Sequence, residues 1–144
     1  MSSPTPAVSA EAAAAAKVFS LDEANRALPY VSRVAVDIAE VYAQVIELRA
    51  ELEGLDDGEL RTLTEREYET TMDRLGGLVD ELHLTGAELR DFERGRVEFP
   101  GRLGHRRIML SWEAGAAAVT GWHDAEADDD TLHPVADLIG ADAA

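Results

Sequence analysis

The sequence predicts an α+β fold, in which a long antiparallel helical hairpin packs on a small antiparallel sheet of three or four strands. Three observations support this prediction. Apolar residues repeat every three or four positions in two long segments, a turn rich in Gly and Asp joins these segments, and strict alternation replaces the longer period after Gly86. The longer period is typical of paired helices, and alternation is typical of half-buried strands.

The first helix is expected over about residues 20–53. Ser20 and Glu23 have the spacing of a capping box, in which each side chain binds a free backbone N–H of the other residue. Pro29 lacks a backbone donor, so we expect the helix to kink or restart there. Beyond Pro29 the apolar seam advances in alternating steps through Val31, Val34, Ile38, Val41, Val45, Leu48 and Leu52.

The second helix is expected over about residues 64–85, after a turn at residues 54–60. Thr64 is the predicted N-cap, with Glu67 completing another capping box, and Gly86 stands where a C-terminal cap is expected. The second apolar seam contains Tyr68, Met72, Leu75, Val79 and Leu82. Two such seams joined by a short turn form an antiparallel hairpin.

Gly76 and Gly77 lie inside the second helix, where each costs about 1 kcal/mol relative to alanine. Two interpretations stay open. Either the glycines allow a neighbouring backbone or ligand to approach closely, or a long helix tolerates them without any such role.

Four short segments with alternating polarity follow, and we expect them to form a meander that spans about residues 87–124. These segments are residues 87–91, 96–100, 106–113 and 117–124. One face of the sheet must be covered, and the hairpin is the available cover. A single domain over residues 19–124 is therefore predicted.

Both ends of the chain are expected to lie outside this domain. Residues 1–18 are rich in Ala, Pro and Ser, with no basic residue before Lys17, so we expect a disordered tail rather than a signal peptide. Residues 125–144 are acidic and contain neither Lys nor Arg. We expect this second tail to stay mostly solvated, with residues 135–139 docking as one short turn.

Composition excludes several classes of function. The 144-residue chain has 29 acids, 13 bases and a net charge of −16, which repels phosphate backbones and anionic membranes. Neither nucleic acid nor a membrane is therefore an expected partner. The chain has no cysteine, which removes disulfides and thiolate chemistry and fits a reducing cytoplasm. We expect a cytoplasmic protein.

No catalytic signature is present, which favours a binding module over an enzyme. The sequence lacks G-x-S-x-G, a P-loop, G-x-G-x-x-G and H-E-x-x-H. Ser111, His123 and Asp124 do not form a triad, because neighbouring strand residues point to opposite faces. The favoured function is an interaction module whose helical hairpin mediates self-association or binds a protein partner.

A candidate pocket lies around His123, and the register of the last hairpin decides which way this residue faces. A loop of two or four residues aligns Val119 with Leu110 and brings His123 to the inner face. A three-residue loop with Gly115 in the left-handed conformation brings Thr120 there instead. Since burial of Val119 outweighs a turn preference, we predict that His123 faces inward.

An inward His123 needs a hydrogen-bond partner, because an unpaired buried polar group costs about 1–3 kcal/mol. Glu98 on a neighbouring strand, or Glu23 and Asn25 in the first helix, could supply it. His123 then either holds the sheet to the helix or lines a pocket for a small ligand or a divalent transition metal. The candidate pocket residues are His123, Glu23, Asn25, Glu98 and Trp112.

Arginine is concentrated in the predicted sheet, at Arg90, Arg94, Arg96, Arg102, Arg106 and Arg107. These side chains either decorate exposed strand faces and pair with nearby acids, or form an anion site, since guanidinium groups fit carboxylates and phosphates. Arg96, Arg106 and Arg107 are the candidates for the anion site.

Several motifs, in this order, resemble one prokaryotic family. They are FSLDEANRALPYV, GRVEFPG, a strand ending in Trp, and a strand ending in Trp-His-acid. Over residues 19–124 the chain is similar to the domain-of-unknown-function family DUF2203. The resemblance implies a helical hairpin with a small sheet and brings no assigned activity. The matching positions are Glu23, Asn25, Pro29, Phe99, Pro100, Trp112, Trp122 and His123. Ser111 departs from the family, which often has Cys there, and this puts any thiol chemistry in doubt.

Overall fold

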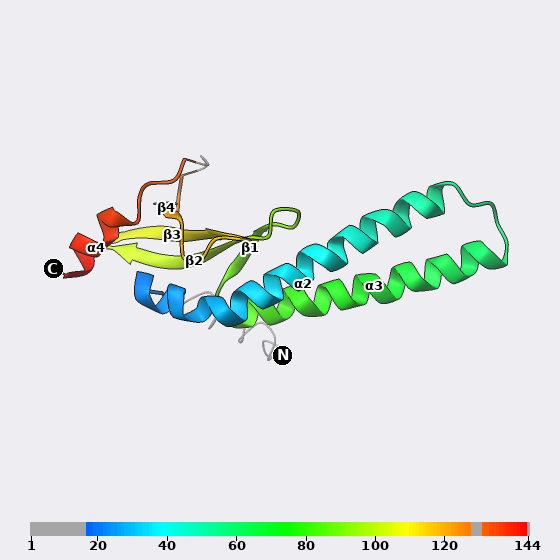
Figure 1. Cartoon of the computed structure of the whole chain (residues 1–144), viewed down its shortest axis with the longest axis horizontal. Helices are drawn as coiled ribbons and strands as arrows, with labels where there is room; N and C mark the ends of the chain where they lie inside the picture. Colours follow the sequence, from blue (N-terminus) through cyan, green and yellow to red (C-terminus); the bar gives the residue numbers. More distant parts are fainter. Residues whose placement is uncertain (1–16, 128–130, 144) are drawn as a thin grey trace, which may run out of the picture.

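The structure consists of a helical hairpin and a four-stranded antiparallel sheet, which confirms the predicted α+β class (Figure 1). This computed structural model describes residues 17–127 and 131–143. Most of the predicted N-terminal tail (residues 1–16) and three acids of the C-terminal tail (residues 128–130) lie outside the described residues. The elements, in order, are α2 (Leu21–Glu53), α3 (Glu59–Leu84), β1 (Glu88–Asp91), β2 (Arg96–Leu103), β3 (Arg106–Glu113), β4 (Gly121–Asp124) and α4 (Ala136–Ala143).

Helix α2 begins at the predicted capping box. The Glu23 N–H donates to Ser20 Oγ at 3.0 Å, and the Ser20 N–H donates to Glu23 Oε1 at 2.9 Å. The helix continues through Pro29, so the predicted restart there is wrong. Leu28 and Val31 on either side of Pro29 are buried, and their packing offsets the missing backbone hydrogen bond. The predicted seam is buried from Val31 to Leu48.

Helix α3 begins at Glu59 rather than at the predicted N-cap Thr64. Gly58 occupies the cap position without a side-chain hydrogen bond. Thr64 is buried, and its hydroxyl donates to the Leu60 carbonyl one turn earlier at 2.9 Å. A capping-box spacing therefore occurs here inside a helix. Gly86 has the predicted role at the other end, because it follows the last turn with a φ of +96°.

Helix α3 carries more apolar residues than its contact with α2 buries. Leu75 and Leu82 are buried in that contact, and Tyr68 and Val79 are half-buried. Met72, which was expected in the same seam, is 40% exposed. It lies on the flank of the seam, because the half-buried Thr71 takes the inner position in this turn.

Gly76 and Gly77 face open space, so no neighbouring backbone in the described part of the chain approaches them closely. A Cβ atom built at either position meets no neighbouring atom within 4 Å. We expect Gly76→Ala and Gly77→Ala each to raise the free energy of unfolding by up to about 1 kcal/mol, because alanine favours helix and meets no obstacle. Urea unfolding measures this change. Gly101→Ala is the matched control and should lower stability, since its Cβ would lie 3.2 Å from the Phe19 carbonyl oxygen.

The core lies between one face of the sheet and the near half of the hairpin. Val97 pairs with Trp112, and Phe99 pairs with Leu110, so the side chains of these four residues share a face. All four are buried in one cluster with α2. The far half of the hairpin extends past the sheet (Figure 1).

The connection between β3 and β4 is longer than any predicted loop. It spans residues 114–120, and the register places Trp122 rather than Val119 opposite Leu110. Val119 is nevertheless buried, and its backbone N–H donates to Asn25 Oδ1 at 2.8 Å. The predicted register is wrong because Val119 reaches the core from the loop and needs no place in the strand.

The described part of the C-terminal tail contacts the sheet, although most side chains of residues 131–139 are exposed. Trp122 and His133 exchange two backbone hydrogen bonds, of 3.0 and 2.7 Å. The Trp122 indole N–H also donates to the Pro134 carbonyl at 3.1 Å. Leu138 is buried in the core cluster and belongs to an eight-residue helix rather than to a single turn.

Candidate functional site

His123 lies on the face of the sheet away from the hairpin, so its predicted inward orientation is wrong. The register pairs His123 with Met109, whereas Leu110 and its partner Trp122 belong to the core face. A shift of one residue exchanges the faces of a strand, and the long β3–β4 connection produces that shift. His123 is only 5% exposed on this outer face.

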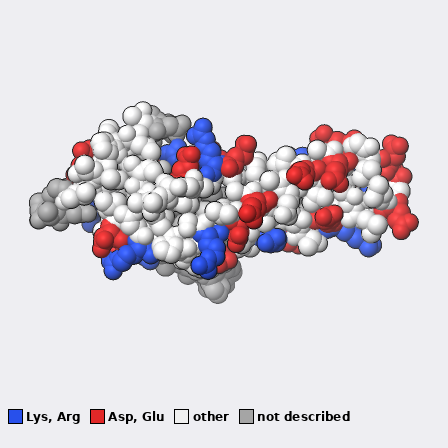
Figure 2. All heavy atoms as spheres, in the orientation of Figure 1, with Lys and Arg blue, Asp and Glu red and all other residues white. Residues whose placement is uncertain are grey.

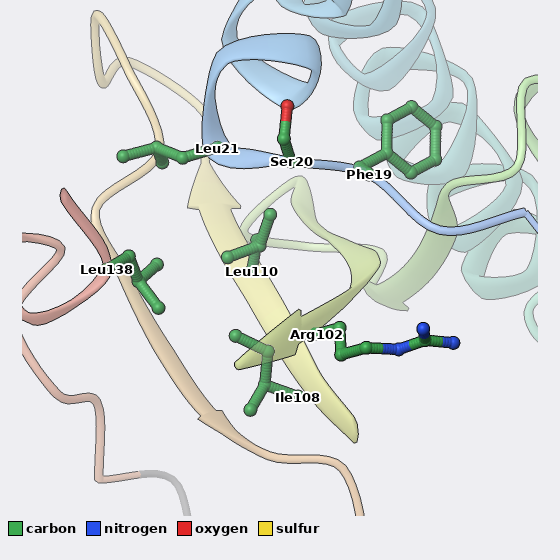
Figure 3. A pocket seen from close by; sticks show the side chains of 7 residues that line it. All are labelled: Phe19, Ser20, Leu21, Arg102, Ile108, Leu110 and Leu138. Atoms are coloured by element: carbon green, nitrogen blue, oxygen red, sulfur yellow. The ribbon is translucent and has the colours of Figure 1, made fainter. Parts of the chain in front are cut away.

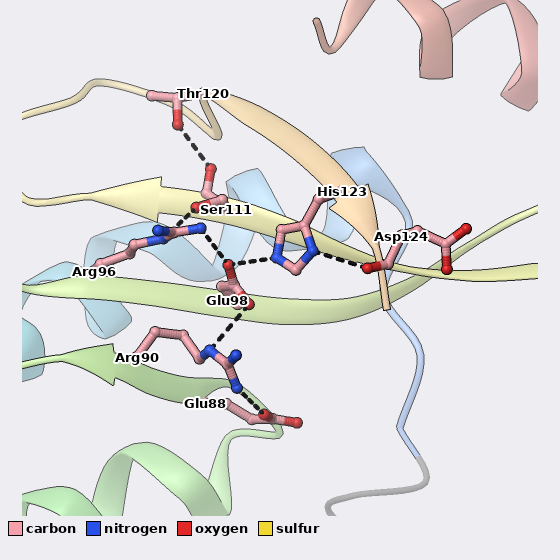
Figure 4. A network of polar contacts seen from close by, with 8 residues as sticks. All are labelled: Glu88, Arg90, Arg96, Glu98, Ser111, Thr120, His123 and Asp124. Atoms are coloured by element: carbon pink, nitrogen blue, oxygen red, sulfur yellow. Dashed lines mark hydrogen bonds and ion pairs between the residues drawn. The ribbon is translucent and has the colours of Figure 1, made fainter. Parts of the chain in front are cut away.

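A buried carboxylate, Glu98, holds His123 there (Figure 4). Glu98 Oε2 lies 2.7 Å from His123 Nε2 and accepts a hydrogen bond from Arg96 Nη2 at 2.8 Å. Arg96 Nε also donates to Ser111 Oγ at 3.2 Å, and Arg90 Nε lies 3.3 Å from Glu98 Oε1. We call these five residues the Glu98 network. Of the predicted partners of His123, the structure selects Glu98.

Both ring nitrogens of His123 face acceptors. Nδ1 lies 2.9 Å from the Asp124 carbonyl oxygen, which can only accept, so Nδ1 carries a hydrogen. The contact of Nε2 with the Glu98 carboxyl needs a second hydrogen, on either the ring or the carboxyl group. Contacts at both ring nitrogens therefore fix the orientation of the His123 ring.

The Glu98 network does not fit a metal ion. In residues 17–127 and 131–143, no three His, Asp or Glu side chains come together in a way that could hold one. The guanidinium groups of Arg90 and Arg96 and the ring of His123 surround the Glu98 carboxylate. Protein cations thus occupy the positions around Glu98 that a metal ion would need.

The other three candidate pocket residues lie elsewhere. Glu23 serves the capping box, where the Ser20 backbone N–H lowers the pKa of its carboxyl group. The Asn25 amide binds the backbone of the β3–β4 loop, and the Trp112 indole N–H donates to a carbonyl in the same loop at 2.8 Å. The structure thus brings together His123 and Glu98 and leaves Glu23, Asn25 and Trp112 outside the network.

Three members of the Glu98 network, namely Arg90, Arg96 and Ser111, were not predicted from the sequence to contact Glu98 or His123. Arg96 and Glu98 are two residues apart in one strand and so share a face, a spacing that could have indicated their ion pair. Arg90 gave no such signal, because it reaches Glu98 where the β1–β2 register is irregular.

The three predicted anion-site arginines have different surroundings. Arg96 belongs to the Glu98 network. Arg106 donates to Asp124 Oδ2 at 2.9 Å and lowers the pKa of that carboxyl group. Arg107 is exposed and lies opposite Arg102 in the register. The arginines therefore do not form one cluster.

A shallow pocket lies under the first turn of α2, on the core side of the sheet (Figure 3). It has about 190 Å³ of empty space, including its open mouth, and is lined by Phe19, Ser20, Leu21, Arg102, Ile108, Leu110 and Leu138. The lining is mostly apolar and lacks the several convergent polar groups that orient a ligand. The pocket is separate from the Glu98 network, which lies on the opposite face. Arg102 lies at the border of the pocket, and its side chain extends away from Ile108 and Leu110 (Figure 3).

The hairpin exposes large apolar side chains along one side, and the contacts of two neighbours show their arrangement. The side chains of Arg49 in α2 and Tyr68 in α3 lie close to each other, and Tyr68 raises the pKa of Arg49. Ile46 lies one turn before Arg49, and Met72 lies one turn after Tyr68, so the antiparallel helices place Ile46 beside Met72. These two side chains are 42% and 40% exposed.

The apolar surface continues toward the sheet. The Tyr42 ring, one turn before Ile46, stacks on Phe92 with 5.0 Å between ring centroids. Phe92 comes from the β1–β2 turn and is 37% exposed. We call Tyr42, Ile46, Met72 and Phe92 the hairpin stripe.

The end of the hairpin remote from the sheet is acidic, and Figure 2 shows red side chains gathered there. Residues 45–70 contain nine acids, namely Glu47, Glu51, Glu53, Asp56, Asp57, Glu59, Glu65, Glu67 and Glu69. The same range contains three bases, Arg49, Arg61 and Arg66. Nine negative against three positive charges leave this end at −6.

Comparison with known proteins gives one match. A family model described as "Uncharacterized conserved protein (DUF2203)" matches residues 17–129. No curated protein and no solved structure matches the chain. In the part of the chain that the structure describes, no helix combines the length and the apolar character that crossing a bilayer requires.

Proposed function

The chain belongs to the DUF2203 family of uncharacterised conserved proteins, and from this premise we propose that it is a cytoplasmic protein-interaction module whose hairpin stripe binds a basic amphipathic helix. The single observation that carries the proposal is the hairpin stripe, of which Ile46, Met72 and Phe92 are exposed, on a hairpin with an acidic end. The absence of cysteine supports the cytoplasmic location.

The stripe has the side chains and the spacing that favour helix docking. Tyr42 and Ile46 are one turn apart on α2, and Met72 lies beside them on α3. Helix-in-groove recognition uses apolar anchors at this spacing, and aromatic residues and methionine are enriched in interfaces. The packing of α2 on α3 leaves two of these side chains, Ile46 and Met72, exposed.

Charge favours a basic partner over a second copy of this chain. A bound helix that covers the stripe and extends Lys or Arg residues toward the turn of the hairpin would meet the acids there, and such complementarity accelerates association and selects partners. Two copies would instead bring two acidic hairpin ends together. Like charges facing each other in an interface oppose association.

Titration with a synthetic amphipathic helix of Leu and Lys tests the proposal, with fluorescence anisotropy as the readout. We expect the full chain to bind this peptide, and Ile46→Ser or Met72→Ser to weaken binding at least about tenfold. Leu63→Ser is the matched control, because Leu63 is exposed on α3 outside the stripe. Circular dichroism verifies that each variant is folded.

Two outcomes would contradict the proposal. Equal binding by the full chain and by the stripe variants would mean that the peptide responds to net charge alone. A dimer that forms without peptide and dissociates in Met72→Ser would identify a second copy as the occupant. A matched peptide of Leu and Glu should not bind, since its charge would face the acidic hairpin end.

A further inference from the structure

We infer that Arg102 and Arg107 form a binding site for a small doubly charged oxyanion, such as a phosphate group, on the face of the sheet away from the hairpin. The two residues are direct cross-strand partners in the β2–β3 ladder, and both are exposed. The Cβ atoms of such partners are about 5 Å apart, so two guanidinium groups can reach one anion. This inference is independent of the hairpin stripe.

The pair is electrostatically unfavourable without a ligand. Like charges directly opposite each other destabilise a sheet. Within residues 17–127 and 131–143, Arg102 and Arg107 form no ion pair or side-chain hydrogen bond. The carboxylates nearest in the ladder are already occupied, because Glu98 binds Arg96 and Asp124 binds Arg106.

The ladder also fixes the separation of the two guanidinium groups. Eight consecutive residue pairs join β2 to β3, and the tight turn at Gly104, with a φ of +62°, lies next to the arginine pair. Pro100 and Met109 form the next pair on the same face, and both are half-buried. The site therefore consists of two guanidinium groups that a regular strand ladder holds beside an apolar surface.

Phosphate is the chemistry that suits this pair. A guanidinium group binds phosphate or carboxylate oxygens through two parallel hydrogen bonds, and a doubly charged anion neutralises two such groups. The net charge of −16 opposes approach of a nucleic acid. The inference is therefore restricted to small anions, either free phosphate or the phosphate group of a small ester.

Thermal unfolding of the full chain at neutral pH tests the inference. Sodium phosphate should raise the Tm by about 2–4 °C above sodium chloride of equal ionic strength, because the ligand binds the folded state alone. In Arg102→Ser and Arg107→Ser this phosphate-specific rise should disappear. Without phosphate, neither variant should be less stable than the unmodified chain, since each substitution removes a repulsion.

Arg66→Ser is the matched control, because Arg66 is an exposed arginine far from the sheet, and it should keep the full rise. Glycerol phosphate distinguishes the two sources of the ligand. A rise with both anions supports a site for phosphate esters, and a rise with inorganic phosphate alone supports a site for the free anion. An equal rise in chloride, or an unchanged rise in Arg107→Ser, would overturn the inference.

Discussion

Replacing Glu98 with alanine is expected to lower the free energy of unfolding by about 3–5 kcal/mol. Glu98 is fully buried, and its carboxylate holds Arg96 at 2.8 Å and His123 at 2.7 Å. Without it, a buried ring and a largely buried guanidinium group lose their acceptor, and an uncompensated buried charge is costly. Urea unfolding followed by circular dichroism measures the loss.

Glu88→Ala is the matched control, because Glu88 is the cross-strand partner of Glu98 and is only half-buried. It should cost less than about 1 kcal/mol. A cycle with Glu98→Ala, His123→Ala and the double variant should be strongly non-additive, since the two side chains share one interaction. A loss below about 1 kcal/mol in Glu98→Ala would contradict the network described here.

The second large effect is expected from Gly121→Ala. A Cβ at this position would lie 2.8 Å from the His133 carbonyl oxygen and 2.9 Å from Leu132 Cβ. Real contacts are longer, so the segment that carries His133 must move away from β4. We expect a loss of about 1–3 kcal/mol, the usual cost of overpacking, and weaker docking of Leu138.

Hydrogen exchange at residues 131–138 provides the specific readout for Gly121→Ala. Amide protection of His133, which donates to Trp122 at 2.7 Å, should fall, while the hairpin keeps its protection. Gly76→Ala is the control, because it adds the same methyl group in open space. Unchanged protection of His133 would show that the C-terminal segment does not depend on the close approach at Gly121.

Features that depend on neighbours in the chain could be predicted well. The capping box at Ser20 needs only residues three positions apart, and the buried seam from Val31 to Leu48 needs only a helical period. Gly86 marked the end of a helix because few other residues adopt its positive φ. The α+β class and the meander order followed from these local patterns.

Features that depend on segments distant in the sequence could not be predicted. Thr64 has the sequence of an N-cap but lies inside α3, because Arg61 binds the carbonyls of Leu52 and Leu55 and extends the helix toward the turn. Docking of residues 135–139 was predicted, but nothing in the sequence indicated that His133 pairs with Trp122 or that Leu138 belongs to an eight-residue helix. In both cases a tertiary contact outweighed a local preference.

The candidate site was likewise predictable only in part. By itself the sequence determined that His123 ends a strand and that Glu98 was one of its candidate partners, because both conclusions rest on residue type and spacing. Only the tertiary structure decided that His123 faces away from the hairpin, that Arg90 and Arg96 complete its network, and that Arg102 opposes Arg107. The physical reason is strand geometry. Successive side chains alternate between the two faces of a sheet, so the length of a loop decides which face each residue of the next strand occupies, and no sequence pattern gave that length.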